Sequence, residues 1–136
     1  MPTQPKAGAV LFAKDVARLA AFYAQVLAVV PKHAEAEKVV IEAEDFLLVI
    51  HAIPPAVAAR VEIASPPALR ENMPVKLFLP VRSLAQARLS AQSQGGGMKP
   101  AEAEWSAADF RACDGFDPEG NVVQFREALR EAALAG

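Results

Sequence analysis

The sequence of 136 residues has little of several residue types on which proteins often build function. Its one cysteine, Cys113, excludes a disulfide within the chain. Its two histidines, His33 and His51, show neither the four-residue helical spacing nor the alternating strand spacing of a preformed metal-binding pair. There is no run of lysine and arginine and the net charge is -2, which argues against nucleic acid as a partner. No apolar run approaches the roughly 20 residues of a membrane span.

Apolar residues, in contrast, are abundant. They make up 53% of the chain against 22% charged residues, which is typical of one folded domain with a real core. The same apolar fraction is compatible with a buried subunit interface. The first residues, MPTQPK, lack an apolar signal segment, and a single cysteine suits a reducing compartment, so we expect a cytoplasmic protein.

The spacing of apolar residues predicts the same order of elements in two halves of the chain. In the first half, Asp15 is a good N-cap for an amphipathic helix over 16–28, which ends before Pro31. Strands are predicted around it at 8–13, 29–34, 38–42 and 46–51. The second half has a predicted helix at 83–92, closed by three glycines, and predicted strands at 75–79, 98–102, 107–112 and 121–127.

These patterns predict an α+β fold of two βαβββ modules, at 7–53 and 75–127. Prolines punctuate residues 54–74, which we interpret as a linker with a short edge strand at 60–63. A short C-terminal helix is predicted within 128–136. The modules should form a cup-shaped mixed sheet.

Two segments resemble the vicinal oxygen chelate superfamily, which includes glyoxalases, bleomycin-resistance proteins, fosfomycin-resistance proteins and extradiol dioxygenases. Residues 9–23 (AVLFAKDVARLAAFY) form a strand that leads into a capped helix. Residues 113–125 (CDGFDPEGNVVQF) form a tight corner that leads into a strand. The resemblance implies a cup made by paired modules and a homodimer.

The resemblance also implies where a divalent metal would be held in the enzymes of this superfamily. The four positions fall at Gly8, near Leu48, at Lys76 and at Gln124. Glycine and leucine have no ligand atom, and a protonated lysine repels a cation, so only the Gln124 amide is able to coordinate. We therefore expect no cofactor. His51 and Gln124 are the weak metal candidates.

Strand alternation predicts what the cup contains instead. Gly8, Val10 and Phe12 should face it from one module, and side chains at 76, 78, 122, 124 and 126 from the other. Such a lining suits a small apolar or aromatic molecule with a carboxylate or similar anion. The predicted ligand-binding residues are Phe12, Leu48, Lys76, Phe78, Trp105, Gln124 and Arg126.

Several of these residues also have a purely structural interpretation. Lys76 is able to extend its ammonium group to the rim of the cup or to pair with Glu42 or Glu104. Trp105 is able to serve in packing or in a dimer contact. Arg126 is able to act as an ion-paired strand residue, and Cys113 as an inert thiol.

Three functions remain open on the sequence alone. The first is a metal-free protein that binds a small ligand, as bleomycin-resistance proteins do. The second is a metal-dependent lyase, isomerase or dioxygenase of the glyoxalase type, with ligands from His51, Gln124 and Glu42. The third is a structural or regulatory partner without a small ligand, for which a large apolar surface at the linker would be the sign.

Overall fold

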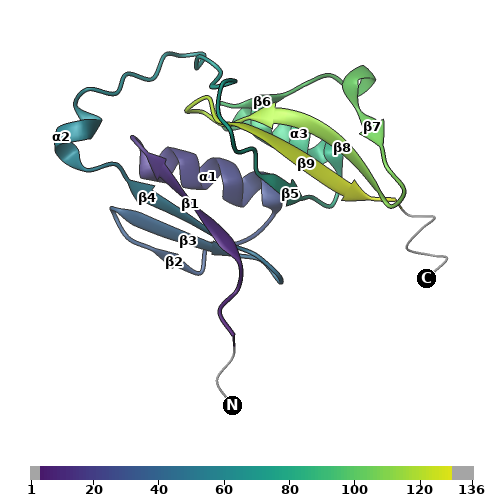
Figure 1. Ribbon diagram of the computed structural model, residues 1–136, viewed down its shortest axis with the longest axis horizontal. Helices are drawn as coiled ribbons and strands as arrows, with labels where there is room; N and C mark the ends of the chain where they lie inside the picture. The colour runs from purple at the N-terminus through teal and green to yellow at the C-terminus, as the bar shows by residue number, and fades with distance from the viewer. Residues whose placement is uncertain (1–3, 130–136) are drawn as a thin grey trace.

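The first of two sheets is built by the N-terminal half of the chain. A computed structural model describes residues 4–129 (Figure 1). The strands lie in the order β1 (Gly8–Ala13), β4 (Leu47–Ala52), β3 (Lys38–Glu42) and β2 (His33–Ala34). β1 runs parallel to β4, and the other pairs are antiparallel.

The second sheet repeats this arrangement with the C-terminal half. Its order is β5 (Phe78–Pro80), β9 (Val122–Ala128), β8 (Phe110–Phe116) and β6 (Gly97–Met98), and β7 (Trp105–Ser106) also pairs with β8. The first strand of the module, β5, again runs parallel to the last, β9. The chain is thus an α+β fold of two βαβββ modules, as the element pattern predicted.

Two helices cover one face of the sheets, and each starts at a side-chain cap. Asp15 accepts a hydrogen bond from the Arg18 N–H at the start of α1 (Val16–Leu27), and Ser83 caps α3 (Leu84–Ser93) in the same way. The two helices pack on each other behind the sheets in Figure 1. Their apolar residues form one core with alternate residues of the strands, including Leu19, Phe22, Tyr23, Ile50, Leu79 and Phe125.

The linker differs most from expectation. Residues 54–74 begin with a short helix, α2 (Pro55–Ala58), in which proline takes the first position that it favours. No strand forms at 60–63, where the Val61 carbonyl accepts a hydrogen bond from Lys14 Nζ instead of a strand partner. Near its end, the Arg70 N–H donates to the Gly120 carbonyl and ties the linker to the second module.

Strand bounds in the second module also shift. β5 begins at Phe78, although the Leu77 carbonyl already accepts from the Gln124 N–H. The predicted strand at 98–102 is replaced by β6 and the turn η1 (Ala101–Ala103), because Pro100 cannot donate to a ladder. The predicted strand 107–112 is β8, at 110–116. Ala128 belongs to β9, not to a helix, and the remainder of the predicted C-terminal helix lies outside the described residues, apart from Leu129.

A corner between β8 and β9 joins the second module to the first. The carboxylate of Glu119 accepts the backbone N–H groups of Lys14 (2.9 Å) and Asp15 (2.8 Å), just before α1. The Tyr23 hydroxyl donates to Asp117 Oδ2 at 2.7 Å. Gly120 has a φ of 89° and lies so close to the Ala68 carbonyl that a Cβ would collide with it. The corner is therefore a buried connection between the halves.

Burial raises the pKa values of the two titratable groups Asp117 and Tyr23 at this corner. Burial raises the pKa of the Asp117 carboxyl above its ordinary value of 3.8, while hydrogen bonds from Tyr23, Asn121 and Glu119 oppose the rise. The pKa of Tyr23 lies well above 10.0, because it is desolvated and faces the Asp117 carboxylate. Tyr23 therefore acts as a hydrogen-bond donor near neutral pH.

Within residues 4–129, no helix has both the length and the apolar character that crossing a bilayer requires.

Candidate functional site

Each sheet has a face directed away from the helices, which we call its open face. The open face of the first sheet includes Val10, Phe12, Val40, Val49 and His51, which are in register across β1, β4 and β3, with Lys38 and Glu42 at the ends of β3. The open face of the second sheet consists of Phe78, Phe110, Asp114, Gln124 and Arg126, on β5, β8 and β9. Of the side chains predicted to line the cup, Val10 and Phe12 lie on the first open face, and Phe78, Gln124 and Arg126 lie on the second.

A chain of polar contacts crosses the open face of the second sheet. Lys76 Nζ donates to Asp114 Oδ2 at 2.8 Å, and Gln124 Nε2 donates to Asp114 Oδ1 at 3.2 Å. Arg126 Nε in turn donates to Gln124 Oε1 at 2.8 Å. The carboxylate thus fixes the Gln124 amide so that its oxygen faces the guanidinium.

Aromatic rings surround the guanidinium at the end of this chain. The Cζ atom of Arg126 lies 3.7 Å from the centroid of the Phe78 ring and 4.2 Å from that of Phe110. Trp105 packs edge-on against Phe110 at 5.7 Å between centroids. Trp105 and Phe78 are nevertheless 46% and 57% exposed. A cation held against exposed rings offers both charge and flat apolar surface to a ligand.

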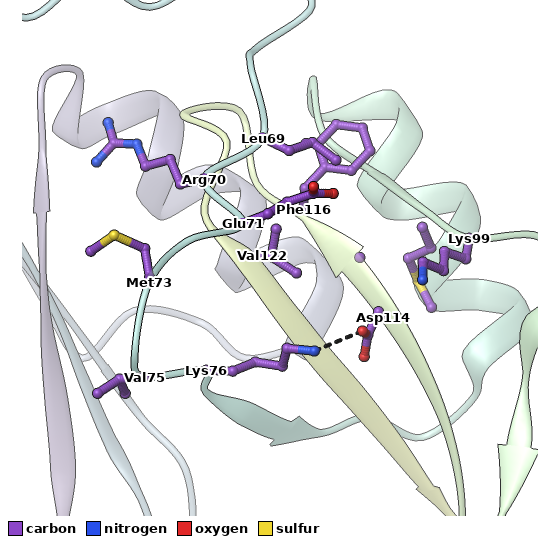
Figure 2. A pocket seen from close by; sticks show the side chains of 12 residues that line it. Leu69, Arg70, Glu71, Met73, Val75, Lys76, Lys99, Asp114, Phe116 and Val122 are labelled. Atoms are coloured by element: carbon purple, nitrogen blue, oxygen red, sulfur yellow. Dashed lines mark hydrogen bonds and ion pairs between the residues drawn. The ribbon is translucent and has the colours of Figure 1, made fainter.

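The other end of the open face borders a cavity of about 380 Å³. The segment 69–76, which runs from the linker toward β5, forms one wall, and β8 and β9 form the other (Figure 2). Apolar walls come from Leu69, Met73, Val75, Met98, Phe116 and Val122. The pair of Lys76 and Asp114 lies at the edge of this space in Figure 2. Its volume falls in the range of small-molecule sites.

The Asp114 carboxylate stays ionised in this setting. Partial burial raises its pKa, but the hydrogen bonds from Lys76 and Gln124 and the charges of Lys76 and Lys99 outweigh burial and hold the pKa below its ordinary 3.8. The Lys76 charge is therefore balanced by a carboxylate near neutral pH.

Solved structures match the chain over most of its length. A glyoxalase/bleomycin resistance protein/dioxygenase family enzyme from Burkholderia phytofirmans has a TM-score of 0.65 at 16% identity, over 90% of this chain and 98% of that chain. A glyoxalase/bleomycin resistance protein from Albidiferax ferrireducens has a TM-score of 0.63 at 15% identity, over 90% and 98%. The chain has the glyoxalase/bleomycin-resistance fold.

The same fold occurs in a metal-bound fosfomycin resistance protein. A mutant of FosX from Listeria monocytogenes, complexed with Mn(II) and a dihydroxypropylphosphonic acid, has a TM-score of 0.61 at 14% identity, over 98% of this chain and 97% of that chain. No family model matches the sequence. No curated protein matches it either. At these identities the likeness establishes the glyoxalase/bleomycin-resistance fold and leaves the chemistry to the side chains.

The strand register corrects one of the predicted site positions. Val10 lies five residues before the cap Asp15 and pairs with Val49, just as Phe78 lies five residues before the cap Ser83 and pairs with Gln124. The counterpart of Gln124 in the first module is thus Val49. The prediction that Leu48 lines the cup is wrong: Leu48 is fully buried in the core, because a shift of one residue turns a strand side chain to the opposite face.

The predicted partners of Lys76 were also wrong. Glu42 pairs with Lys6 and Lys32, and Glu104 pairs with Arg88 and Arg111. Lys76 instead forms an ion pair with Asp114, a residue that the sequence analysis did not predict. A signal for Asp114 existed, because counting outward from the corner places Asp114 opposite Gln124. Asp114 was not predicted because the predicted strand 107–112 stops two residues before it, whereas β8 continues to Phe116.

The side chains present do not fit a divalent metal of the kind seen in FosX. The positions that the resemblance assigns to metal ligands, with Val49 in place of Leu48, hold Gly8, Val49, Lys76 and Gln124, and both polar groups of Gln124 are engaged within the protein. His51 lies edge-on to Phe12 in the first sheet, and its Nδ1 lies 2.9 Å from the Ala52 carbonyl. Within residues 4–129, no three side chains of His, Cys, Asp or Glu gather closely enough to hold an ion.

The remaining candidates divide between the two sheets. The structure brings Phe78, Gln124, Arg126, Trp105 and Lys76 to one face of the second sheet. Phe12 lies on the first sheet, where it contacts His51. Cys113 is buried on the helix side, with Arg88 Nη2 at 3.6 Å from its sulfur.

Proposed function

We propose that the protein binds a small, partly apolar or aromatic molecule at the open face of the second sheet, without a metal ion. The cavity of about 380 Å³ beside Lys76 and Asp114 is the observation that carries this proposal. It combines apolar walls with a few converging polar groups, which is the usual composition of a small-molecule site. On the same sheet, outside this cavity, Phe78 of β5 adds an exposed ring.

The side chains at the expected metal-ligand positions support binding without a metal ion. A lyase or dioxygenase of the glyoxalase type needs two or three protein ligands and open coordination sites for substrate oxygens. Gly8 and Val49 offer none, and Gln124 is used to orient Arg126. Metal-dependent chemistry would therefore need ligands that this face does not assemble.

A homodimer in the cytoplasm is part of the same proposal. Val10 and Phe12 are 53% and 57% exposed on the open face of the first sheet, and a second copy is the partner that would cover them. The described structure holds one buried, unpaired cysteine, Cys113, which suits a reducing compartment.

Tryptophan fluorescence tests ligand binding directly, because Trp105 is the only tryptophan and lies beside Phe110 at the proposed site. We expect saturable changes in emission with members of a panel of bicyclic aromatics and medium-chain fatty acids. Metal content per subunit after dialysis against Mn²⁺, Zn²⁺, Ni²⁺ and Fe²⁺ should stay near zero. No saturable response to any compound would refute the binding function, and one tightly held ion per subunit would refute the metal-free form of it.

A further inference from the structure

We propose that Arg126, and not Lys76, selects the ligand, and that it selects a carboxylate. This inference rests on the proposed binding function and names the chemical class that the site takes. The sequence offered two cations on the same face, and their surroundings separate their roles.

Lys76 is a poor selector of anions because its charge is already balanced. Its ammonium group lies 2.8 Å from Asp114 Oδ2, and the Asp114 carboxylate is only 20% exposed. An incoming carboxylate would meet the negative charge of Asp114 beside the positive charge of Lys76. The pair therefore offers hydrogen bonds to a ligand and little net attraction for an anion.

Arg126 is held differently. Two aromatic rings, at 3.7 and 4.2 Å, contact its guanidinium without neutralising it. Its Nε is fixed by Gln124, whose orientation is in turn fixed by Asp114. Among residues 4–129, the guanidinium makes no further hydrogen bond and no ion pair, which leaves its two Nη atoms as donors.

This arrangement matches the geometry of a carboxylate. The two oxygens of a carboxylate accept parallel hydrogen bonds from the planar fork of an arginine, and a lysine cannot offer that pair. Because the rings and Gln124 hold the fork before binding, little side-chain freedom is lost when the bonds form. Phe78 contacts the guanidinium and is 57% exposed, so the flat part of such a ligand would pack beside it.

The cavity lies within reach of the same ligand. Val122 borders the cavity and is four residues from Arg126 along β9, which is about 13 Å in a strand. A molecule anchored at Arg126 would therefore extend toward the cavity over Gln124. A bicyclic aromatic acid has the size to occupy much of this distance.

The test uses two probes of equal shape, 2-naphthoate and 2-naphthamide, on the full chain by calorimetry and Trp105 fluorescence. We expect the wild-type protein to bind the acid at least about tenfold more tightly than the amide, the usual size of a charge-assisted hydrogen-bond effect. Arg126→Lys keeps the charge and loses the fork, so the preference should fall below about threefold. The exposed control Arg60→Lys should keep the full preference.

The outcomes separate the two proposals. Equal binding of acid and amide by the wild-type protein overturns the role of Arg126 and leaves ligand binding standing. A preference that survives Arg126→Lys but disappears in Lys76→Gln assigns selection to Lys76 and also overturns it. Binding of neither probe counts against both. Should Arg126→Lys fail to fold, Phe78→Leu removes one ring from the guanidinium and should reduce the preference several-fold.

Discussion

The two open faces share an architecture and differ in chemistry. In both sheets the first strand of the module runs parallel to the last, and a helix covers the opposite face. The centre of the first open face is apolar, with Val10 paired to Val49, while the charged residues Lys38 and Glu42 lie at the two ends of β3. Its aromatic contact joins Phe12 to His51. The second carries a lysine, an aspartate, a glutamine and an arginine in one connected chain.

The two modules share the same strand arrangement, and the second has a connected set of polar side chains across its open face. Val10 and Phe78 occupy equivalent positions, as do Val49 and Gln124. Backbone pairing requires neither set of side chains, because both sheets form with the same register. The polar chain of the second face is therefore more than a requirement of the fold. On the first face, the exposed side chains of Val10 and Phe12 are suited to contact with another protein surface.

The largest expected effect is the loss of stability on breaking the connection that Glu119 makes between the two modules. Glu119→Ala removes the carboxylate that accepts two backbone N–H groups before α1, at a side chain that is only 4% exposed. We expect a loss of about 3 kcal/mol in the free energy of unfolding, from two lost charge-assisted bonds and buried donors left unpaired. Urea denaturation measures it. Glu62→Ala, at an exposed linker residue, should cost less than about 0.5 kcal/mol.

A smaller effect at the same corner should depend on pH. Tyr23→Phe removes the 2.7 Å hydrogen bond to Asp117 and should cost about 1 kcal/mol. That bond lowers the pKa of Asp117 against the effect of burial, so its loss raises the folded-state pKa further. A raised folded-state pKa means that stability is lost as pH rises through it. The cost should therefore be larger at pH 7 than at pH 4. An equal cost at both would show that Asp117 does not change its protonation state between these two pH values.

The elements predicted from the sequence were those with strong local signals. Asp15 and Ser83 fix the starts of both helices through their own side chains, and the predicted bounds agree within one or two residues. β1 and β3 have the predicted bounds as well. The linker was predicted less well, because its conformation is set by contacts with distant residues, such as that of Lys14 with Val61.

The site was predicted in part for the same reason. Alternation along a strand correctly placed Phe78, Gln124 and Arg126 on one face, since that needs only the register of neighbouring residues. Which partners they meet depends on pairing across strands. The ion pair of Lys76 with Asp114 and the clamp of Phe110 on Arg126 arise from β8, whose bounds were predicted too early in the chain. Whether any of these residues binds a ligand stays a prediction.

A matched pair of phenylalanines compares the two faces directly. Phe12 and Phe78 are both 57% exposed, on equivalent first strands. Phe78→Leu removes a ring from Arg126 and should weaken 2-naphthoate binding about three- to fivefold, the value of a partly exposed cation–π contact. Phe12→Leu should change it less than twofold, as read by Trp105 fluorescence. Equal weakening by both would mean that the first face also contacts the ligand, within one chain or across a dimer.

The smallest expected effect follows from removing the negative charge of the Lys76–Asp114 ion pair on the second face. Asp114→Asn keeps the shape of the side chain and removes its charge, so Lys76 becomes an unbalanced cation near the site. Carboxylate binding should tighten about two- to threefold at low salt, since partly exposed charges interact weakly through water. The gain should disappear at about 1 M salt, where the Debye length is about 3 Å. The fixed contact with Arg126 should keep most of its preference for acid over amide under the same conditions.

The charge on Asp114 should not change between about pH 5 and pH 8. Because the folded-state pKa of Asp114 is lowered, the stabilisation from its pair with Lys76 is present above its ordinary pKa of 3.8 and is lost as pH falls through the lowered value. Between about pH 5 and 8 the pair stays intact, so the affinity for 2-naphthoate should be flat there. A rise in affinity on going from pH 8 to pH 5 would show that Asp114 is already taking up a proton, and that Lys76 contributes to anion binding near neutral pH.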